Sequence, residues 1–197
     1  MKHYANPMSR AVTTNWMLAE LDAPHEQVTI DFASDQQQSP EYLAINPMGK
    51  VPALEDEGMV VTEVAAICAY LADKFPEKQL APPTNSPLRA AYYRYLFVAG
   101  NTLEPLFALK SIGFTHPNAM SAGWGDMARG LATIEAMTPE SDWALGRQFT
   151  TADVVFGGML DFSMRFGWME PSPNVLAYVQ RLRARPAYQA THAVFDA

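Results

Sequence analysis

Two neighbouring stretches of the sequence decide the fold: Asn46-Pro47-Met48-Gly49-Lys50-Val51-Pro52-Ala53-Leu54 and Glu63-Val64-Ala65-Ala66-Ile67-Cys68-Ala69-Tyr70-Leu71. In the first stretch Pro52 stands at the entry to a predicted strand, where a proline removes one donor from the strand ladder. A cis peptide bond between Val51 and Pro52 is one solution, because for a bond to proline it costs only about 0.5–1 kcal/mol. It would turn the N–H and C=O of Val51 away from the sheet and toward an extended ligand. An ordinary loop proline is the alternative.

The second stretch places Glu63 at the start of a predicted helix, directly after a predicted strand. The helix dipole stabilises a carboxylate there by about 0.3–1 kcal/mol, which is a purely structural explanation. The functional explanation is a carboxylate that faces a ligand ammonium group, beside backbone N–H groups that receive a ligand carboxylate. The residues alone leave both explanations open.

Residues 1–76 alternate between strand-like and helix-like segments. Apolar residues recur with strand or helix periodicity, and Ser39-Pro40-Glu41 is a good helix start with proline at its first position. Strands are predicted over residues 2–5, 26–32, 51–54 and 59–61, and helices over residues 9–21, 42–45 and 63–75. A hairpin turn is expected at residues 55–58. The order βαβ, α, ββα predicts a small α/β domain.

The rest of the chain has only helical periodicity. Residues 77–86 are predicted to be a linker, because their prolines cannot sustain a helix, and residues 87–197 an all-helical domain. Helices are predicted over residues 87–109, 117–137, 150–166 and 175–183, with a short one from Pro186. Glu104-Pro105 predicts a kink in the first of them. Arg181, Arg183 and Arg185 are expected at a solvated helix end.

Composition limits the function classes. The chain has 197 residues, 18% of them charged, with a net charge of -7, so a nucleic-acid partner is not expected. No apolar run is long enough for a membrane span or a secretory signal, so we expect a cytoplasmic protein without a membrane partner. The one cysteine, Cys68, excludes an internal disulfide and cysteine-rich metal sites, and no metal is expected.

Together the two stretches resemble the glutathione-binding half of the cytosolic glutathione transferases, whose pattern is Asn-Pro-x-Gly-Lys-Val-Pro followed by Glu/Asp-Ser-x-Ala-Ile-x-x-Tyr-Leu. The resemblance extends over the whole chain, since Thr150-Thr151-Ala152-Asp153 is similar to the family's helix-capping box. It implies a thioredoxin-like domain followed by an all-α domain. It also implies glutathione as cosubstrate and a homodimer.

The resemblance also implies a role for each matching residue. The backbone of Val51 would pair with the cysteinyl unit of glutathione, and Pro52 would be the cis proline. Glu63 would hold the γ-glutamyl amine. Lys50 would reach the glycyl carboxylate, with a solvated surface lysine as the alternative.

One residue departs from the family pattern. Val64 replaces the family's serine, whose hydroxyl helps to bind the γ-glutamyl carboxylate, and only the backbone N–H remains. Losing such a hydrogen bond to a charged group costs about 1.5–3 kcal/mol, roughly tenfold to a hundredfold in affinity.

In the family a hydroxyl or thiol near the end of the first strand activates the glutathione sulfur. Ser9 is the first candidate, because Ser9-Arg10-Ala11-Val12 is similar to the segment of the bacterial, serine-type members, although a plain N-cap serine is equally expected. Asn6 is the second candidate and Tyr4 the third. Cys68 lies on the apolar face of its helix, where a buried inert thiol is expected.

The resemblance therefore implies attack by the glutathione thiolate on a small electrophile, bound between the two domains. Two alternatives remain. One is a glutathione-dependent disulfide reductase or isomerase, and the other is a catalytically weak glutathione-binding protein on the same fold.

Overall fold

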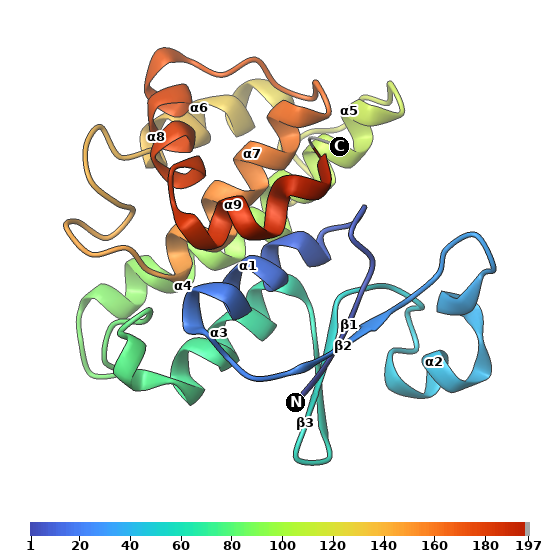
Figure 1. Ribbon diagram of the computed structural model, residues 1–197. Coiled ribbons are helices and arrows are strands. Elements are labelled where there is room, and N and C mark those ends of the chain that lie inside the picture. The colour runs from blue at the N-terminus through green and yellow to red at the C-terminus, as the bar shows by residue number, and fades with distance from the viewer. Residues whose placement is uncertain (196–197) are drawn as a thin grey trace. The chain divides into compact units, whose positions relative to one another are not determined.

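The order of strands and helices predicted for the first half is confirmed by the structure, a computed structural model that describes residues 1–195 (Figure 1). The elements follow one another as β1 (Lys2–Ala5), α1 (Ala11–Leu21), β2 (Glu26–Thr29), α2 (Pro40–Ile45), β3 (Ala53–Asp56), β4 (Met59–Thr62) and α3 (Val64–Lys74). The second strand is shorter than predicted. It ends at Thr29, and Phe32, within the predicted strand, is 40% exposed.

The four strands form one mixed sheet in the order β2-β1-β3-β4. Strand β1 runs parallel to β2 and antiparallel to β3, and β3 is antiparallel to β4. Glu57 and Gly58 join β3 to β4 with φ angles of 50° and 80°, which is the left-handed geometry of a two-residue hairpin turn. The turn is therefore two residues tighter than the predicted one.

Helices cover both faces of this sheet. Side chains alternate along a strand, so His3 and Tyr4 point to opposite faces. His3 contacts Thr14 of α1, with 2.8 Å between its Nε2 and the threonine Oγ1, whereas Tyr4 packs with Tyr42 of α2. Helices α1 and α3 contact each other beside the sheet. This is the thioredoxin-like arrangement that the resemblance implies.

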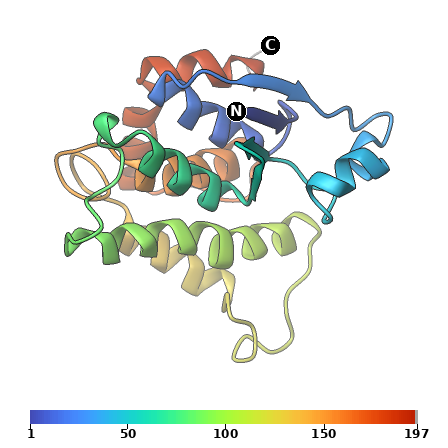
Figure 2. The ribbon, with the colours of Figure 1, turned by 90° about the horizontal axis from the view of Figure 1, so that it is seen from below.

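The last helix, α9 (Pro186–His192), packs against α1 (Figure 2). The ring of Trp16 meets that of Tyr188 edge to face, with 5.1 Å between the centroids. Arg185 donates to both carboxylate oxygens of Glu20, at 2.6 and 2.7 Å. The chain accordingly divides into two units, Met1–Lys78 with the segment from Arg185 onward, and Gln79–Ala184. That segment was assigned to the helical domain in the sequence-based division, which therefore differs from the division by contacts.

The second unit contains the helices α4 (Leu88–Val98), α5 (Glu104–Ser111), α6 (Met127–Met137), α7 (Gly158–Arg165) and α8 (Pro173–Arg183). A π-helical turn, Ala99–Leu103, joins α4 to α5, directly before the Glu104-Pro105 pair at which a kink was predicted. The helix predicted to follow Pro117 begins ten residues later, at Met127, where the Asp126 side chain accepts a hydrogen bond from the Arg129 N–H.

Close packing and buried charges hold this second unit together. A Cβ at Gly157 would collide with Leu182, so only glycine lets α8 approach there. The carboxylate of Asp161 is buried and pairs with both Arg165 and Arg183. Arg183 and Arg185, expected at a solvated helix end, stay partly exposed, and each also has a carboxylate partner. Within residues 1–195, no helix is both long and apolar enough to cross a membrane.

Candidate functional site

The loop that leads into β3 is held by its own side chains. The carbonyl of Lys50 accepts hydrogen bonds from the Tyr42 hydroxyl at 2.6 Å and from the Asn46 amide at 2.7 Å. Gly49 has a φ of +59°, and a Cβ there would lie 2.9 Å from the Gln37 carbonyl oxygen. These constraints explain why the Asn-Pro-x-Gly pattern needs its asparagine and its glycine. Sequence reasoning assigned no role to Tyr42 or Asn46, although Asn46 opens the motif.

The peptide bond between Val51 and Pro52 is cis, as predicted. Pro52 is buried and Val51 is half-buried. Pairing between β1 and β3 stops at Ala53, so Val51 lies beyond the ladder. In the described part of the chain neither the amide nor the carbonyl of Val51 has a hydrogen-bond partner. Both groups are therefore available to an extended ligand.

Glu63 occupies the residue before α3 in an unusual backbone conformation, with φ 72° and ψ 126°. A non-glycine residue at positive φ of this kind costs of order 1–3 kcal/mol, and such residues cluster at functional sites. Its side chain is exposed and has no hydrogen bond or ion pair among residues 1–195. No side chain caps α3, so the N–H groups of Val64, Ala65 and Ala66 also lack acceptors there. The helix start offers free donors beside a free carboxylate.

The strand register brings these groups to one end of the sheet. Ala53 pairs with Thr62 across β3 and β4. Val51 lies just before one member of this pair and Glu63 just after the other. Ala53 also pairs with Tyr4, near the end of β1, and the segment that leads to Ser9 leaves from that end. Three segments that are distant in sequence therefore meet at this end of the sheet.

Ser9 lies in the turn between β1 and α1. Its hydroxyl donates to the Asn6 carbonyl at 2.6 Å and accepts from the Ala11 N–H at 3.1 Å. This is the N-cap type of contact expected as the alternative. The Asn6 side chain is engaged as well, donating to the Ile30 carbonyl and accepting from the Met8 N–H, both at 2.9 Å. Ser9 must therefore exchange its Asn6 contact if it is to donate to a ligand.

Tyr4, the third candidate, lies elsewhere, and Cys68 is buried as expected. The Tyr4 hydroxyl donates to Glu55 at 2.9 Å, and Glu55 is the cross-strand partner of Lys2, at the far end of β1. Burial, together with Glu55, raises the pKa of Tyr4 to about 12. The thiol of Cys68 is fully buried, and burial raises its pKa well above the usual range. Neither group is presented as a donor at the end of the sheet that carries Val51.

Lys50 is exposed and has no ion pair among the described residues. The part of the chain described here contains no group of three or more histidine, cysteine, aspartate or glutamate side chains that could hold a metal ion. The electrostatic character of the candidate site therefore comes from the Glu63 carboxylate, the start of α3 and the Lys50 ammonium.

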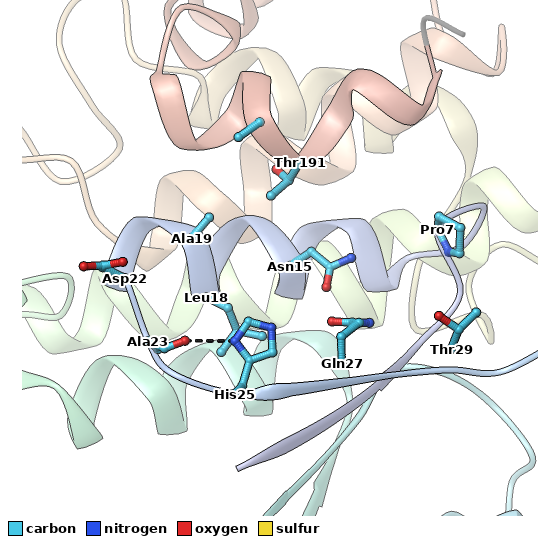
Figure 3. Close-up of a pocket in the computed structure, with 11 residues that line it drawn as sticks. Pro7, Asn15, Leu18, Ala19, Asp22, Ala23, His25, Gln27, Thr29 and Thr191 are labelled. Carbon is cyan, nitrogen blue, oxygen red and sulfur yellow. Dashed lines mark hydrogen bonds between the residues drawn. The ribbon is translucent and has the colours of Figure 1, made fainter.

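A pocket of the first unit, about 480 Å³ in volume, is not at this end of the sheet (Figure 3). Residues of α1, β2 and α9 line it, among them Asn15, Gln27, His25 and Thr191. Figure 3 shows the hydrogen bond between His25 Nδ1 and the Ala23 carbonyl, which is 2.8 Å long. None of the predicted site residues lines this pocket.

Family models match both halves of the chain. The glutathione S-transferase N-terminal domain matches residues 1–73, and the glutathione S-transferase C-terminal domain matches residues 117–181. The first match contains all of the predicted site residues, and the second contains the Thr150–Asp153 capping segment.

Individual relatives agree with the family models. The chain is 28% identical to glutathione S-transferase GstA of Escherichia coli O157:H7 over 96% of each chain. It is also 28% identical to maleylacetoacetate isomerase of Pseudomonas aeruginosa, over 96% of this chain and 93% of that one. Among solved structures, a sphingomonad glutathione S-transferase in complex with glutathione superposes with a TM-score of 0.80 and 27% identity. The match covers 100% of this chain and 99% of that one.

Proposed function

The chain belongs to the glutathione S-transferase family, and from that premise we propose that it is a glutathione transferase whose cosubstrate binds at the end of the sheet that carries Val51 and Glu63. The observation that carries the proposal is that two sets of groups without hydrogen-bond partners flank the Ala53–Thr62 pair of the β3–β4 ladder. One set is the backbone N–H and C=O of Val51, and the other is the start of α3 together with the Glu63 carboxylate.

The proposed contacts follow the chemistry of the tripeptide. The N–H and C=O of Val51, next to Pro52, pair with the cysteinyl unit as an added strand would. The N–H groups at the start of α3, including that of Val64, receive the γ-glutamyl carboxylate, and Glu63 receives the neighbouring ammonium group. Lys50 is the cation for the glycyl carboxylate. All of these groups belong to the first unit.

The proposed reaction needs the thiolate, because the thiol is a poor nucleophile. An ordinary thiol has a pKa of about 8.5, and lowering it by roughly two units takes about 2.7 kcal/mol of anion stabilisation. In our proposal Ser9 releases the Asn6 carbonyl and donates to the sulfur, and Asn6 is the second candidate. The thiol proton is lost to water, and the thiolate forms a bond to the electrophilic carbon. In a substitution the leaving group departs with the electron pair of its bond; in an addition the carbon–carbon π bond breaks, and its electron pair moves to the neighbouring carbon, which takes a proton from water.

A second candidate function is a glutathione-dependent isomerisation. The observation that favours it is the 28% identity to a protein named maleylacetoacetate isomerase. Disulfide reduction by glutathione is the other reaction left open, and the buried thiol of Cys68 takes no part in it. Two observations favour a weakly catalytic binding protein. Val64 lacks the hydroxyl of the family's serine, and the Ser9 hydroxyl already donates to the Asn6 carbonyl. The homodimer, the small electrophilic partner and the cytoplasmic location stay predictions.

Calorimetric titration with glutathione tests the proposal. Glu63→Gln removes the charge from the amine contact, so binding is expected to weaken about tenfold or more, since a hydrogen bond between charged groups contributes about 1.5–3 kcal/mol. Glu26→Gln is the matched control, because Glu26 is an exposed carboxylate on the other edge strand. Equal affinity for wild type and Glu63→Gln would remove Glu63 from the site, and no binding at millimolar glutathione would overturn the proposal.

Turnover with an aryl halide tests the role of Ser9. Ser9→Ala is expected to lower kcat tenfold or more while glutathione affinity changes less than about twofold, because the hydroxyl acts on the thiolate. Unchanged turnover would move the role to Asn6. Loss of binding and turnover together would make Ser9 a structural N-cap only.

A further inference from the structure

Strand β2 lies at the edge of the sheet and has one open side, since β1 is its neighbour on the other. The Glu26 N–H donates to the Met1 carbonyl at 3.0 Å, so the backbone groups of Glu26 face β1. Backbone groups face the two sides of a strand alternately, and those of Gln27 and Thr29 therefore face away from the sheet. Within residues 1–195 these outward N–H and C=O groups have no hydrogen-bond partner.

The free edge of β2 is a template for a further strand. Unpaired N–H and C=O groups along an edge strand can pair with an extended segment of another chain. Recognition of this kind takes its affinity from the main-chain hydrogen bonds and its specificity from pockets that receive alternate side chains. An edge that selects a partner therefore needs a pocket beside it.

Such a pocket lies directly beside β2. It is the pocket of about 480 Å³ shown in Figure 3, and His25, Gln27 and Thr29 form its strand side. These are alternate residues, so their side chains point to one face of the sheet, toward α1. Asn15 and Ala19, which are neighbours on one face of α1, line it from the other side. All of the lining residues belong to the first unit, and the volume is ample for a long side chain.

The polar groups of the pocket favour a cation. Asp22 is exposed and has no ion pair among the described residues. His25 Nδ1 lies 2.8 Å from the Ala23 carbonyl oxygen, so this nitrogen carries the proton, and in the neutral ring Nε2 is an acceptor. The Thr191 hydroxyl donates to the Ala187 carbonyl at 2.9 Å, which leaves its oxygen to accept. No lysine or arginine is among the described residues that line the pocket.

The surrounding surface has the same sign of charge. Residues 11–49, which include α1, β2 and α2, contain six carboxylates and no lysine or arginine. The carboxylate of Glu20 is paired with Arg185, whereas that of Glu26, on β2 itself, is exposed and has no ion pair within residues 1–195. A surface of this kind attracts a basic segment and repels an acidic one.

We propose that the open edge of β2 binds an extended segment of another protein as an added strand, and that a lysine or arginine side chain of this segment enters the pocket. The N–H and C=O groups of Gln27 and Thr29 pair with its backbone. The cationic group faces Asp22 and donates to His25 Nε2. None of the proposed glutathione contacts lines the pocket, so this contact is separate from the proposed reaction.

Fluorescence anisotropy with a fluorescein-labelled peptide, Thr-Lys-Val-Lys-Val-Lys-Thr, tests the proposal on the full-length wild type. All of its lysines lie on one face when the peptide is extended. The same peptide with glutamate in place of each lysine is expected to bind at least tenfold more weakly, because like charges repel. Equal binding of the two peptides would overturn the proposal.

Methylation of the peptide backbone tests the added strand itself. In an antiparallel addition, the residues whose side chains face the pocket also direct their N–H groups to β2, whereas in a parallel addition the alternate residues do so. Methylating the backbone nitrogens of the lysines in one peptide and of the valines in another is therefore expected to lower affinity tenfold or more in one of them only. The sensitive peptide gives the direction of the added strand. Equal affinity of both methylated peptides would overturn the proposal.

Substitutions in the protein locate the site. Thr29→Pro removes an outward N–H, which an edge strand can lose without losing its own ladder, and is expected to weaken peptide binding about tenfold. Thr29→Val is the matched control, because it keeps the N–H, and it should bind as the wild type does. Asp22→Asn suits the φ of 51° at this position and should weaken binding several-fold and reduce its dependence on salt. Glu41→Gln, an exposed carboxylate outside the pocket, is the control for charge alone.

Wild-type affinity of Thr29→Pro for the peptide, or equal weakening by Asp22→Asn and Glu41→Gln, would overturn the proposal. The methylated peptides need no change to the protein, so they decide the question even if Thr29→Pro does not fold. Glutathione titration of each variant is expected to match the wild type. A wild type that binds the peptide but not glutathione would support this proposal and overturn the proposed function.

Discussion

The helix that begins at Val64 and the helix that follows Thr150 start in opposite ways. At Val64 the first N–H groups lack acceptors, and the neighbouring Glu63 carboxylate is exposed and unpaired among residues 1–195. After Thr150 the Asp153 carboxylate is buried and accepts four hydrogen bonds. These come from the Thr150 N–H at 2.9 Å, the Thr150 hydroxyl at 3.2 Å, the Ala144 N–H at 2.7 Å and the Tyr178 hydroxyl at 2.9 Å.

The difference separates structure from binding. Both helix starts combine orphan N–H groups with a nearby carboxylate, which is a ready site for an anion or a cap. In the second unit the chain satisfies these groups itself. In the first unit it leaves them free and also keeps Glu63 at positive φ, which costs stability. We call the helix start at Asp153 the closed site and the helix start at Glu63 the open site. We expect changes at the closed site to act on stability and changes at the open site to act on affinity.

The largest expected effect is on the closed site. Asp153→Ala leaves the Thr150 N–H and the Tyr178 hydroxyl as buried donors without an acceptor, at about 1–3 kcal/mol each, so the free energy of unfolding should fall by about 3–5 kcal/mol. Urea unfolding measures it. Asp126→Ala is the control, since that N-cap has one such bond at 2.9 Å and should lose only about 1 kcal/mol. Similar losses for both variants would contradict the distinction.

His3 extends the comparison to a closed polar site in the first unit. Burial lowers its pKa to about 4, against the opposing hydrogen bond to Gln27. In the unfolded chain the ring takes up a proton near pH 6.5, whereas the folded chain resists it down to about pH 4. Stability should therefore fall as the pH drops through this window, by up to about 3 kcal/mol.

Urea unfolding of the wild type and His3→Gln at several pH values measures that loss. The slope between pH 6.5 and 4 should be smaller in the variant, which has no ring to protonate. His116→Gln, in the second unit, is the control and should keep the wild-type slope. Parallel curves for wild type and His3→Gln would show that other groups cause the acid sensitivity.

Completing the open site should change affinity. Val64→Ser adds the hydroxyl that the family pattern has at this position, which should tighten glutathione binding by about tenfold to a hundredfold, or about 1.5–3 kcal/mol. Calorimetry measures it. Val64→Ala removes the same methyl groups without adding a hydroxyl and should bind as the wild type does. A gain in Val64→Ala equal to that in Val64→Ser would assign the effect to space rather than to the hydrogen bond.

The smallest expected effect concerns the backbone of Glu63. Glycine tolerates a φ of 72°, so Glu63→Gly should be more stable than Glu63→Ala by about 1 kcal/mol, although both variants lose the carboxylate. Thermal unfolding of the two variants gives the difference directly. If they melt together, the positive φ carries no cost and the open site is not strained.

Local patterns predicted most of the first unit. The strand and helix order and the helix start at Ser39-Pro40 depend on neighbours in sequence, and both are confirmed. The cis bond before Pro52 is confirmed too, but the family resemblance implied it, whereas the residues alone left an ordinary loop proline open. The positions of Val51 and Glu63 at one end of the sheet also follow from the hairpin between them. The start of α6 was misplaced because residues 117–126 contain helix-compatible residues but form a loop that ends at the Asp126 cap.

Long-range partners could not be predicted. The sequence does not show that Tyr4 meets Glu55, because that contact depends on the strand register. Nor does it show that Arg183 pairs with Asp161. Each of these contacts changes the chemistry of a residue that sequence reasoning treated as free. Composition and periodicity do not contain that information.

The contact of Arg185 with Glu20 has a consequence for how the protein is made. The two residues are 165 positions apart, yet α9 covers Trp16 in the same unit that carries the proposed glutathione contacts. On the ribosome, the nascent first unit must wait for the final helix before its α1 surface is covered. A premature stop or a bulky fusion after α8 should therefore weaken glutathione capture, even though all the proposed contact residues are encoded in the opening third of the message.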